Sequence, residues 1–162
     1  MKNYSVIAAA DEKFGIGKDG LIPWRFPEDF KWFKSMTTGS TCFMGHNTYR
    51  ELAQIMHGKA ELLPKRKCVV FSSRVIKDPR IAVCHNIEKF DEYSDSSENF
   101  FIGGTSIFEF GLKHADYVYL TAIPGDHRCN VIFPHQALTE KFVLNREITL
   151  SDALKVNVYG RR

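Results

Sequence analysis

Short apolar runs rich in β-branched residues alternate with helix-like stretches along most of the chain. The strand-like runs are, in order, Tyr4–Ala10, Thr41–Met44, Lys67–Phe71, Ile81–Cys84, Asn99–Ile102 and Asp116–Ile123. The helix-like stretches are Pro27–Met36, Thr48–Met56, Ile87–Tyr93 and Ser106–Lys113. Because strands that alternate with helices form parallel sheets covered by those helices, the pattern predicts an α/β fold with a central, mostly parallel sheet and about four flanking helices.

The C-terminal end of the sequence departs from this alternation. Two strand-like runs, Lys141–Thr149 and Ala153–Tyr159, are separated only by a short turn at 150–152, which predicts an antiparallel hairpin that closes the sheet. The 162 residues contain no internal repeat and no linker-like segment. A chain of this length usually forms one domain, so we expect residues 1–162 to be a single domain.

The composition argues against several classes of partner. The chain is 44% hydrophobic and 25% charged and has a net charge of +3. Its Lys and Arg residues form no cluster, so we expect no nucleic acid partner. The apolar run Val6–Ala10 is shorter than the core of a signal peptide, and no run approaches the roughly 20 residues of a membrane span. We therefore expect a cytoplasmic protein without a membrane partner. We also expect the protein to be a monomer.

The cysteine and histidine patterns give no indication of a metal site. None of the four cysteines forms a C-x-x-C pair, and three of them (Cys42, Cys68 and Cys84) lie inside apolar runs. The six histidines lack H-x-x-x-H spacing. These patterns favour buried free thiols in a reducing compartment and no bound metal. The sequence also lacks a G-x-S-x-G motif, so it offers no candidate nucleophile.

A single acid lies beside the apolar face of the helix expected after Pro27. At 100° per residue, Phe26, Phe30 and Phe33 fall within about 60° of one another, and Asp29 lies near the edge of that stripe. Asp29 could simply complement the helix dipole, because it would be the third residue of the helix. That explanation accounts for an acid in the first turn but not for its aromatic surroundings, which suggest a ligand.

Three glycines before this helix match G-x-G-x-x-G, the pattern of a dinucleotide-binding turn. They are Gly15, Gly17 and Gly20. That motif requires a strand immediately before it and a helix that opens within it. Here four residues separate the motif from the strand and Pro23 follows it, so we interpret the glycines as hinges of a mobile loop.

Better candidates for phosphate contacts follow three of the expected strands. These segments are Gly45-His46-Asn47-Thr48, Gly103-Gly104-Thr105-Ser106 and Ser72-Ser73-Arg74. Each brings backbone N–H groups, hydroxyls or a cation to the carboxyl end of a strand, where open α/β sheets bind ligands. A glycine turn before a helix is common by itself, but three such segments at one edge suggest a long phosphorylated ligand such as a dinucleotide. One buried acid, aromatic walls and a dinucleotide suit hydride transfer, because the cofactor supplies the reactive group.

The sequence resembles the dihydrofolate reductase family in a series of short motifs that occur in family order over nearly the whole chain. They are Ile7-Ala8-Ala9, Gly17–Lys34 around Pro23-Trp24 and Asp29, Phe43-Met44-Gly45-x-x-Thr48-Tyr49, Leu63-Pro64-x-Arg66, Phe71-Ser72-Ser73-Arg74, Ile102-Gly103-Gly104, Tyr119-Leu120-Thr121 and Phe133-Pro134. The resemblance implies an eight-stranded sheet and the NADPH-dependent reduction of 7,8-dihydrofolate to tetrahydrofolate. It also implies a role in one-carbon metabolism and thymidylate synthesis, and binding of antifolate inhibitors.

The resemblance implies a set of substrate contacts. Asp29 would bind the 2-amino group and a ring nitrogen of the pterin, with Thr121 supporting its carboxylate, and Arg66 would bind the glutamate carboxylate of dihydrofolate. Taken by itself, Arg66 could equally be a solvated residue after a turn. The further substrate contacts would be Ile7, Phe30, Phe33, Lys34, Leu52, Leu63 and Ile102, and Ile22 and Trp24 would join Asp29 and Thr121 at the reacting centre.

The resemblance implies a second set of contacts for NADPH. The nicotinamide would lie against Ala8 and Ile16, under a lid that runs from Gly17 to Trp24. The phosphates and the adenosine would be held by the remaining cofactor residues, which are His46, Asn47, Thr48, Ser72, Ser73, Arg74, Ile102, Gly103, Gly104, Thr105, Ser106, Ile107 and Phe108. The pair Gly103-Gly104 would be joined by a cis peptide bond.

The expected reaction is hydride transfer from the nicotinamide to C6 of the pterin, with N5 protonated by water while Asp29 orients and polarises the ring. The chain departs from the family pattern at His46, where a permanent cation is usual, at Asn130, where an acid is common, and at Phe108, which replaces a tyrosine. The stretch Ala53–Leu62 also looks longer than in compact relatives. Two alternatives are a related pteridine or pyrimidine reductase of the same fold and a nucleotide-binding module without catalysis.

Overall fold

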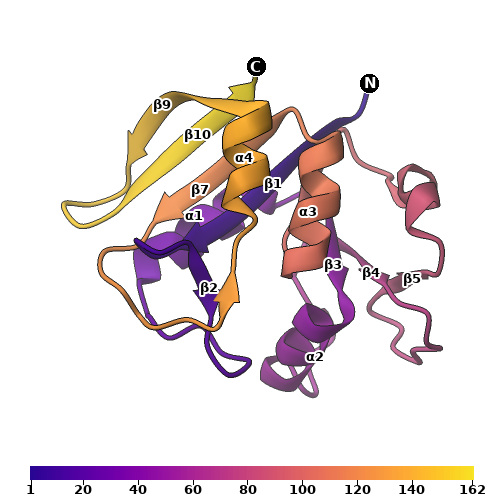
Figure 1. Cartoon of the computed structure of the whole chain (residues 1–162). Helices are drawn as coiled ribbons and strands as arrows, with labels where there is room; N and C mark the ends of the chain where they lie inside the picture. Colours follow the sequence, from indigo (N-terminus) through magenta and orange to yellow (C-terminus); the bar gives the residue numbers. More distant parts are fainter.

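The structure, a computed structural model, describes residues 1–162 and is built around one eight-stranded sheet (Figure 1). The strands of this sheet are β1 (Asn3–Ala10), β3 (Thr41–Gly45), β4 (Lys67–Phe71), β5 (Ala82–Cys84), β6 (Glu98–Phe101), β7 (Tyr117–Ala122), β9 (Phe142–Thr149) and β10 (Lys155–Arg161). Their spatial order is β5-β4-β3-β6-β1-β7-β10-β9. Six neighbouring strands are parallel, and β10 pairs antiparallel with both β7 and β9. The predicted sheet with its C-terminal hairpin is confirmed.

A second, two-stranded sheet was not predicted from the sequence. It pairs β2 (Gly15–Gly17) with β8 (Val131–Ile132) in antiparallel orientation. Strands of three and two residues are too short to produce a recognisable alternation of apolar and polar residues. This small sheet nevertheless joins the segment after β1 to the segment after β7, which lie more than a hundred residues apart in the chain.

Helices cover both faces of the large sheet. They are α1 (Pro27–Thr37), α2 (His46–Ile55), α3 (Thr105–His114), α4 (His135–Lys141) and the 3₁₀ helix η1 (Ile87–Tyr93). In the view of Figure 1, α3 and α4 lie in front of the sheet and α1 lies behind it. Three expectations about the helices were wrong. The second helix begins at His46 rather than Thr48, the stretch Ile87–Tyr93 is 3₁₀ rather than α-helical, and α4 was missed. Its seven residues are too few to show a helical period.

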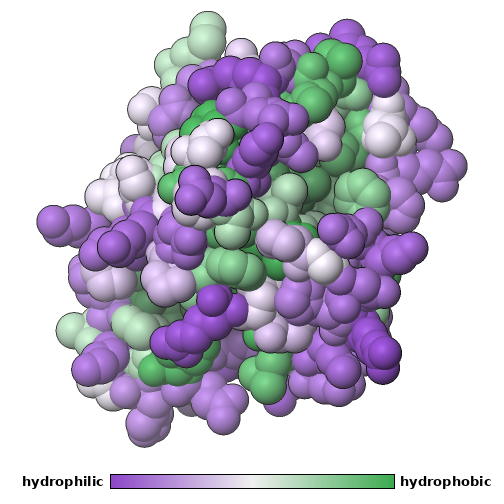
Figure 2. Space-filling view, turned by 90° about the vertical axis from the view of Figure 1, so that its left-hand side faces the viewer, coloured by the Kyte–Doolittle hydropathy of each residue, from purple (hydrophilic) through white to green (hydrophobic).

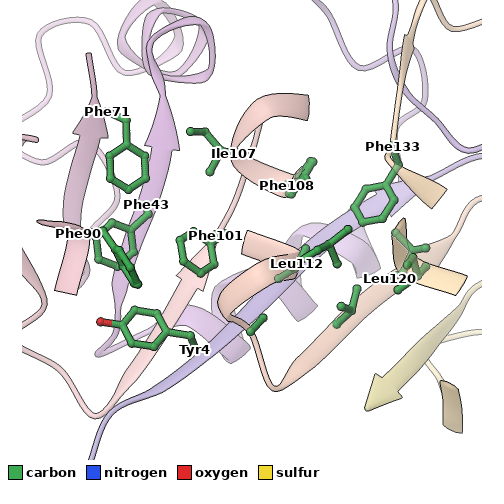
Figure 3. Close-up of a cluster of buried hydrophobic side chains, with 14 of the residues drawn as sticks. Tyr4, Phe43, Phe71, Phe90, Phe101, Ile107, Phe108, Leu112, Leu120 and Phe133 are labelled. Carbon is green, nitrogen blue, oxygen red and sulfur yellow. The ribbon is translucent and has the colours of Figure 1, made fainter. Parts of the chain in front are cut away.

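The larger core lies between the sheet and α3 and is dominated by phenylalanine (Figure 3). Phe43 and Phe101 are fully buried, and Phe43 stacks on Phe71 with 5.6 Å between the ring centroids. Tyr4 and Phe90 complete this aromatic cluster. Truncating a buried phenylalanine to alanine typically costs about 3–5 kcal/mol, so these rings are a main source of stability.

A smaller core on the other face of the sheet supports α2. Met44, Leu62, Cys68 and Val70 are buried there against partly exposed apolar residues of the helix, among them Leu52.

Cys42, Cys68 and Cys84 are buried and free, as the sequence predicted. None of the helices combines the length and the apolar composition that a membrane crossing requires. On the side shown in Figure 2, hydrophobic residues reach the surface in patches among hydrophilic ones.

The glycines that match the dinucleotide pattern have other roles, which corrects the interpretation of them as hinges. Gly15 and Gly17 belong to β2, and a Cβ atom on Gly15 would lie only 2.4 Å from Cβ of Cys129. Close packing therefore requires glycine at position 15. Of these three glycines, only Gly20 has a positive φ, of +80°, and together with Asp19 at +52° it forms a tight turn. No helix opens within the motif, since α1 begins at Pro27.

Candidate active site

Asp29 lies in the first turn of α1 and reaches β7. Pro27 is the first residue of the helix, and Thr121 Oγ1 donates a hydrogen bond of 2.8 Å to Oδ1 of Asp29. The second oxygen, Oδ2, accepts no hydrogen bond from the protein. Burial raises the pKa of Asp29, the Thr121 hydrogen bond opposes this, and the charge of Glu28 adds to it. The half-buried carboxylate therefore has one anchored oxygen and one oxygen free for a ligand.

Large apolar side chains near Asp29 are exposed. Phe30 is 52% exposed and Ile22 is 53% exposed, although both are large and hydrophobic. Phe33 is half-buried on the same helix. Trp24 is buried instead, packed against Ile123 and Leu154. Exposed apolar side chains next to a partly desolvated acid are typical of the mouth of a ligand site.

Arg66 is held against the far end of α1. Its Nη1 donates to Oγ1 of Thr37 at 3.1 Å, its Nε donates to the carbonyl of Pro64 at 3.1 Å, and its guanidinium lies 5.9 Å from the ring centroid of Phe33. Asp29 and Thr37 are eight residues apart, which corresponds to about 12 Å along a helix. One helix thus carries an acid near its start and orients a cation near its end. This arrangement matches an elongated ligand that has hydrogen-bond donors at one end and a carboxylate at the other.

Two helix N-termini meet at the carboxyl edge of the sheet. Gly45 precedes α2 and Gly104 precedes α3, and neither helix start has a side-chain cap. The strands are tied together there, because Gly45 N–H donates to the carbonyl of Gly103 at 2.8 Å. Gly103 and Gly104 are joined by a cis peptide bond, and Thr48 Oγ1 lies beside them. Uncapped helix starts leave N–H groups that favour anions, so this edge fits the phosphates of a dinucleotide.

The remaining cofactor candidates are divided between this edge and the core. The ring of His46 lies beside Tyr49, and Nδ1 of His46 is buried without a hydrogen-bond partner in the protein. After β4, Ser73 and Arg74 are exposed and half-buried Ser72 accepts a hydrogen bond from the backbone of Arg74. Asn47 and Ser106 are exposed, Ala8, Ile16 and Thr105 are half-buried, and Ile107 and Phe108 are buried in the main core.

The substrate candidates are arranged in a similar way. Ile7 is buried in β1, and Thr121 faces α1 from β7. Leu52, Leu63 and Ile102 are half-buried around the smaller core. Lys34 is exposed on the surface of α1. The structure therefore brings Asp29 and Thr121 into direct contact and places Arg66 beside Phe33, while it leaves Lys34 at the periphery.

The lid residues Gly17–Trp24 are bound to the loop that follows β7. Asp19 N–H donates to Oδ1 of Asn130 at 3.2 Å, and Nδ2 of Asn130 donates to the carboxylate of Asp19 at 3.0 Å. Asn130 N–H also donates to the carbonyl of Gly17 at 3.0 Å. The amide that departs from the family pattern at this position therefore still fastens the tip of the lid.

One residue on α2 and one on α1 were not identified from the sequence. Oε1 of Glu51 lies 4.0 Å from the position that a Cβ of Gly20 would occupy, and burial raises the pKa of Glu51. Its place three residues after Thr48, on the same face of α2, was the available signal. Trp32 on α1 has a buried indole N–H without a partner in the protein, and nothing in its sequence context indicates this.

Comparison with known proteins agrees with this geometry. The sequence model of the family described as "Dihydrofolate reductase" matches residues 3–158. The chain belongs to the dihydrofolate reductase family. The reaction of dihydrofolate reductases is the NADPH-dependent reduction of dihydrofolate to tetrahydrofolate, which feeds one-carbon metabolism, and family membership assigns this activity to the chain.

Individual dihydrofolate reductases show the extent of the similarity. The enzyme of Buchnera aphidicola is 35% identical over 137 residues, which cover 84% of this chain and 81% of the relative. That of Staphylococcus aureus is 34% identical over 131 residues, covering 80% and 77%. A solved structure of dihydrofolate reductase from Enterococcus faecalis, complexed with NADP(H) and RAB-propyl, shares the fold with a TM-score of 0.85 at 24% identity, covering 99% of this chain and 96% of that one.

One relative is a longer protein with another name. Segregation and condensation protein A of Mycoplasma pneumoniae is 30% identical over 131 residues, which cover 78% of this chain but only 24% of that protein. The similarity is therefore confined to about a quarter of the longer protein.

Proposed function

We propose that Asp29 anchors the pterin when this chain reduces 7,8-dihydrofolate to tetrahydrofolate. The hydrogen bond from Thr121 to Asp29 is the observation that carries the proposal, because it fixes one carboxylate oxygen and leaves the other free. A carboxylate with a free edge matches the paired N–H donors of a pterin ring. The raised pKa of Asp29 reflects a partly desolvated site, where such hydrogen bonds are stronger.

We propose that Arg66 binds the glutamate carboxylate of the substrate at the other end of α1. Its contact with Thr37 orients the guanidinium and leaves Nη2 without a partner in the protein. Phe30 and Phe33 lie between Asp29 and Arg66 along the helix and would pack against the benzoyl group. This arrangement favours dihydrofolate over smaller pteridines or pyrimidines, which lack a distant carboxylate.

The residues of the sheet edge would bind NADPH, which supplies the hydride. The uncapped starts of α2 and α3, with His46, Asn47, Thr48 and Thr105, would hold the phosphates, and Ser72, Ser73 and Arg74 would surround the 2′-phosphate. The lid would cover the nicotinamide and exclude bulk water while admitting the water that protonates N5. Asp29 would orient the ring and polarise it toward protonation.

A kinetic assay tests this proposal. Loss of NADPH absorbance should depend on dihydrofolate and should stop on addition of methotrexate. The variant Arg66→Met should raise the KM for dihydrofolate about tenfold or more while leaving the rate with a dihydropterin lacking the glutamate unchanged. Arg146→Met, on the exposed edge strand β9, is the matched control. NADPH oxidation that does not depend on dihydrofolate would refute the proposal.

We further propose that the chain acts as a single-domain monomer in the cytoplasm. The eight-stranded sheet takes strands from residue 3 to residue 161, and the free buried cysteines suit a reducing compartment. Light scattering of the purified chain should give the mass of one copy, and a mass of two copies would contradict this.

A further inference from the structure

A shielded ion pair lies between β4 and β5, outside the residues placed at the active site. Arg80 Nε donates to Oδ1 of Asp78 at 2.9 Å, and Arg80 Nη2 donates to Oδ2 at 2.8 Å. The side chains of Arg80 and Asp78 are only 15% and 9% exposed. The hydroxyl of Tyr49, on α2, donates to the same Oδ2 at 2.7 Å. The guanidinium of Arg80 holds the pKa of Asp78 well below its usual range.

Arg80 also binds the end of α2. Its Nη1 donates to the carbonyl of Met56 at 2.9 Å and to the carbonyl of Lys59 at 3.4 Å. Met56 is the C-terminal cap of the helix, where free carbonyls and the helix dipole favour a cation. Arg80 therefore fixes both the helix end and the turn that follows it.

This network borders both binding regions of the proposed enzyme. At one end, the ring of Tyr49 lies 6.2 Å from that of His46, which we place at the NADPH phosphates. At the other end, the turn fixed by Arg80 leads to Leu63 and then to Arg66, which we place on the substrate. A continuous set of hydrogen bonds and ring contacts thus joins the two ends of α2.

We propose that Tyr49, Asp78 and Arg80 are positioning residues that set α2 and the turn after it in the geometry that binds NADPH and dihydrofolate. The inference rests on the proposed function but concerns residues that touch neither ligand. Two parallel hydrogen bonds to one carboxylate define a geometry that a single contact cannot. Because the pair is shielded from water, removing one partner leaves an unpaired charge and displaces the elements attached to it.

The variants should separate binding from chemistry. Arg80→Met releases the turn and should raise the KM for dihydrofolate and the Kd for NADPH about tenfold, with kcat at saturation within about twofold, because Asp29 and Thr121 are not disturbed. Tyr49→Phe removes one hydrogen bond at the His46 end and should raise only the Kd for NADPH, by about threefold. Arg80→Lys keeps the charge but not the paired hydrogen bonds, so it should restore binding only in part.

The experiment measures KM, kcat, Kd for NADPH by fluorescence titration, and Tm. Lys67→Met is the matched control, because it breaks an ion pair of 2.6 Å to Asp95 whose partners are more exposed, at 32% and 73%. A lower Tm with unchanged KM and Kd in Arg80→Met and Tyr49→Phe would overturn the proposal, since the network would then be purely structural. If Arg80→Met does not fold, Tyr49→Phe decides alone. The NADPH titration requires no turnover, so its result is distinguishable from a failure of the proposed function.

Discussion

Two aspartates, Asp11 and Asp29, lie before and after the lid in the chain, and their pKa values are shifted in opposite directions. Asp11, just after β1, is 5% exposed, and its carboxylate accepts hydrogen bonds from the backbone N–H groups of Lys13, Gly15 and His127 at 2.8–2.9 Å. Burial by itself would raise the pKa of Asp11, but these donors more than offset it, and the pKa is lowered.

Asp29 receives one hydrogen bond, whereas Asp11 receives three from backbone N–H groups and a fourth from the thiol of Cys129. Burial dominates there, and the pKa of Asp29 is raised. The two sites show that an acid becomes available for a ligand when the fold desolvates it without saturating its oxygens. An acid whose oxygens are all used by the backbone serves the structure.

Replacing the unsaturated acid should abolish most of the activity. We expect Asp29→Asn to lower kcat at neutral pH by about 100-fold or more, since the polarising carboxylate is lost, while the Kd for NADPH stays the same. Stopped-flow kinetics and NADPH titration provide the measurement, and Glu28→Gln in the same helical turn is the control. Turnover close to that of the unaltered chain would remove Asp29 from the mechanism.

Replacing the saturated acid should affect stability rather than chemistry. We expect Asp11→Asn to lower the free energy of unfolding by about 1–3 kcal/mol, because an amide cannot accept all three backbone hydrogen bonds of the buried carboxylate. Urea unfolding measures this, and kcat well below the Tm should change by less than about threefold. A large loss of kcat at unchanged stability would show that Asp11 also belongs to the site.

Removing the support of Asp29 should have an intermediate effect. Thr121→Val deletes the 2.8 Å hydrogen bond and should lower kcat/KM about fivefold to tenfold, as expected for one hydrogen bond to a carboxylate. The pKa of Asp29 should rise further, because this hydrogen bond opposes the effect of burial. The pH dependence of kcat/KM would reveal the shift. Thr121→Ser retains the hydroxyl, so it should behave like the unaltered chain if the bond is what matters.

The smallest predicted effect is a pH dependence of opposite sign for the two acids. The lowered pKa of Asp11 means that its charged form stabilises the fold above the unfolded value of 3.8, and this contribution is lost as the pH falls through the folded pKa. The raised pKa of Asp29 means that its contribution is complete below 3.8 and is lost as the pH rises through the folded pKa.

Unfolding of both Asn variants at neutral pH and near pH 3, below the unfolded value of 3.8, tests these signs. The loss in Asp11→Asn should shrink in acid, whereas Asp29→Asn should be slightly more stable than the unaltered chain at neutral pH, by less than the ~1.4 kcal/mol of a full pKa unit, and should lose that gain in acid. The same sign for both variants would contradict the contrast.

Much of the fold followed from local patterns in the sequence. The strand-like runs correspond closely to the eight strands of the sheet, and the run Lys67–Phe71 matches β4 residue for residue. The elements that escaped prediction, β2, β8 and α4, are shorter than the stretch of residues over which a periodic pattern can be recognised. Pro27 predicts the start of α1, and the structure confirms it, because the fixed φ and missing N–H of proline suit that position.

The active site was predictable only in part. The sequence identified Asp29 as an acid beside an aromatic stripe, but it left the helix dipole as an alternative. It also gave Gly15 a role in flexibility, whereas the structure shows close packing against Cys129. Glu51 follows Thr48 by three residues, but an acid on a helix is usually solvated, and the proximity of its carboxylate to Gly20 of the lid is visible only in the structure.

The sequence by itself determined the order of strands and helices along the chain and the closing hairpin, because these depend on patterns among residues close together in the chain. It also supplied acids at positions 11 and 29. The tertiary structure decided which acid is free for a ligand. Thr121 is 92 residues from Asp29, and His127 is 116 residues from Asp11. The state of each carboxylate depends on the number of donors that distant segments bring to it, and no local period in the chain encodes that number.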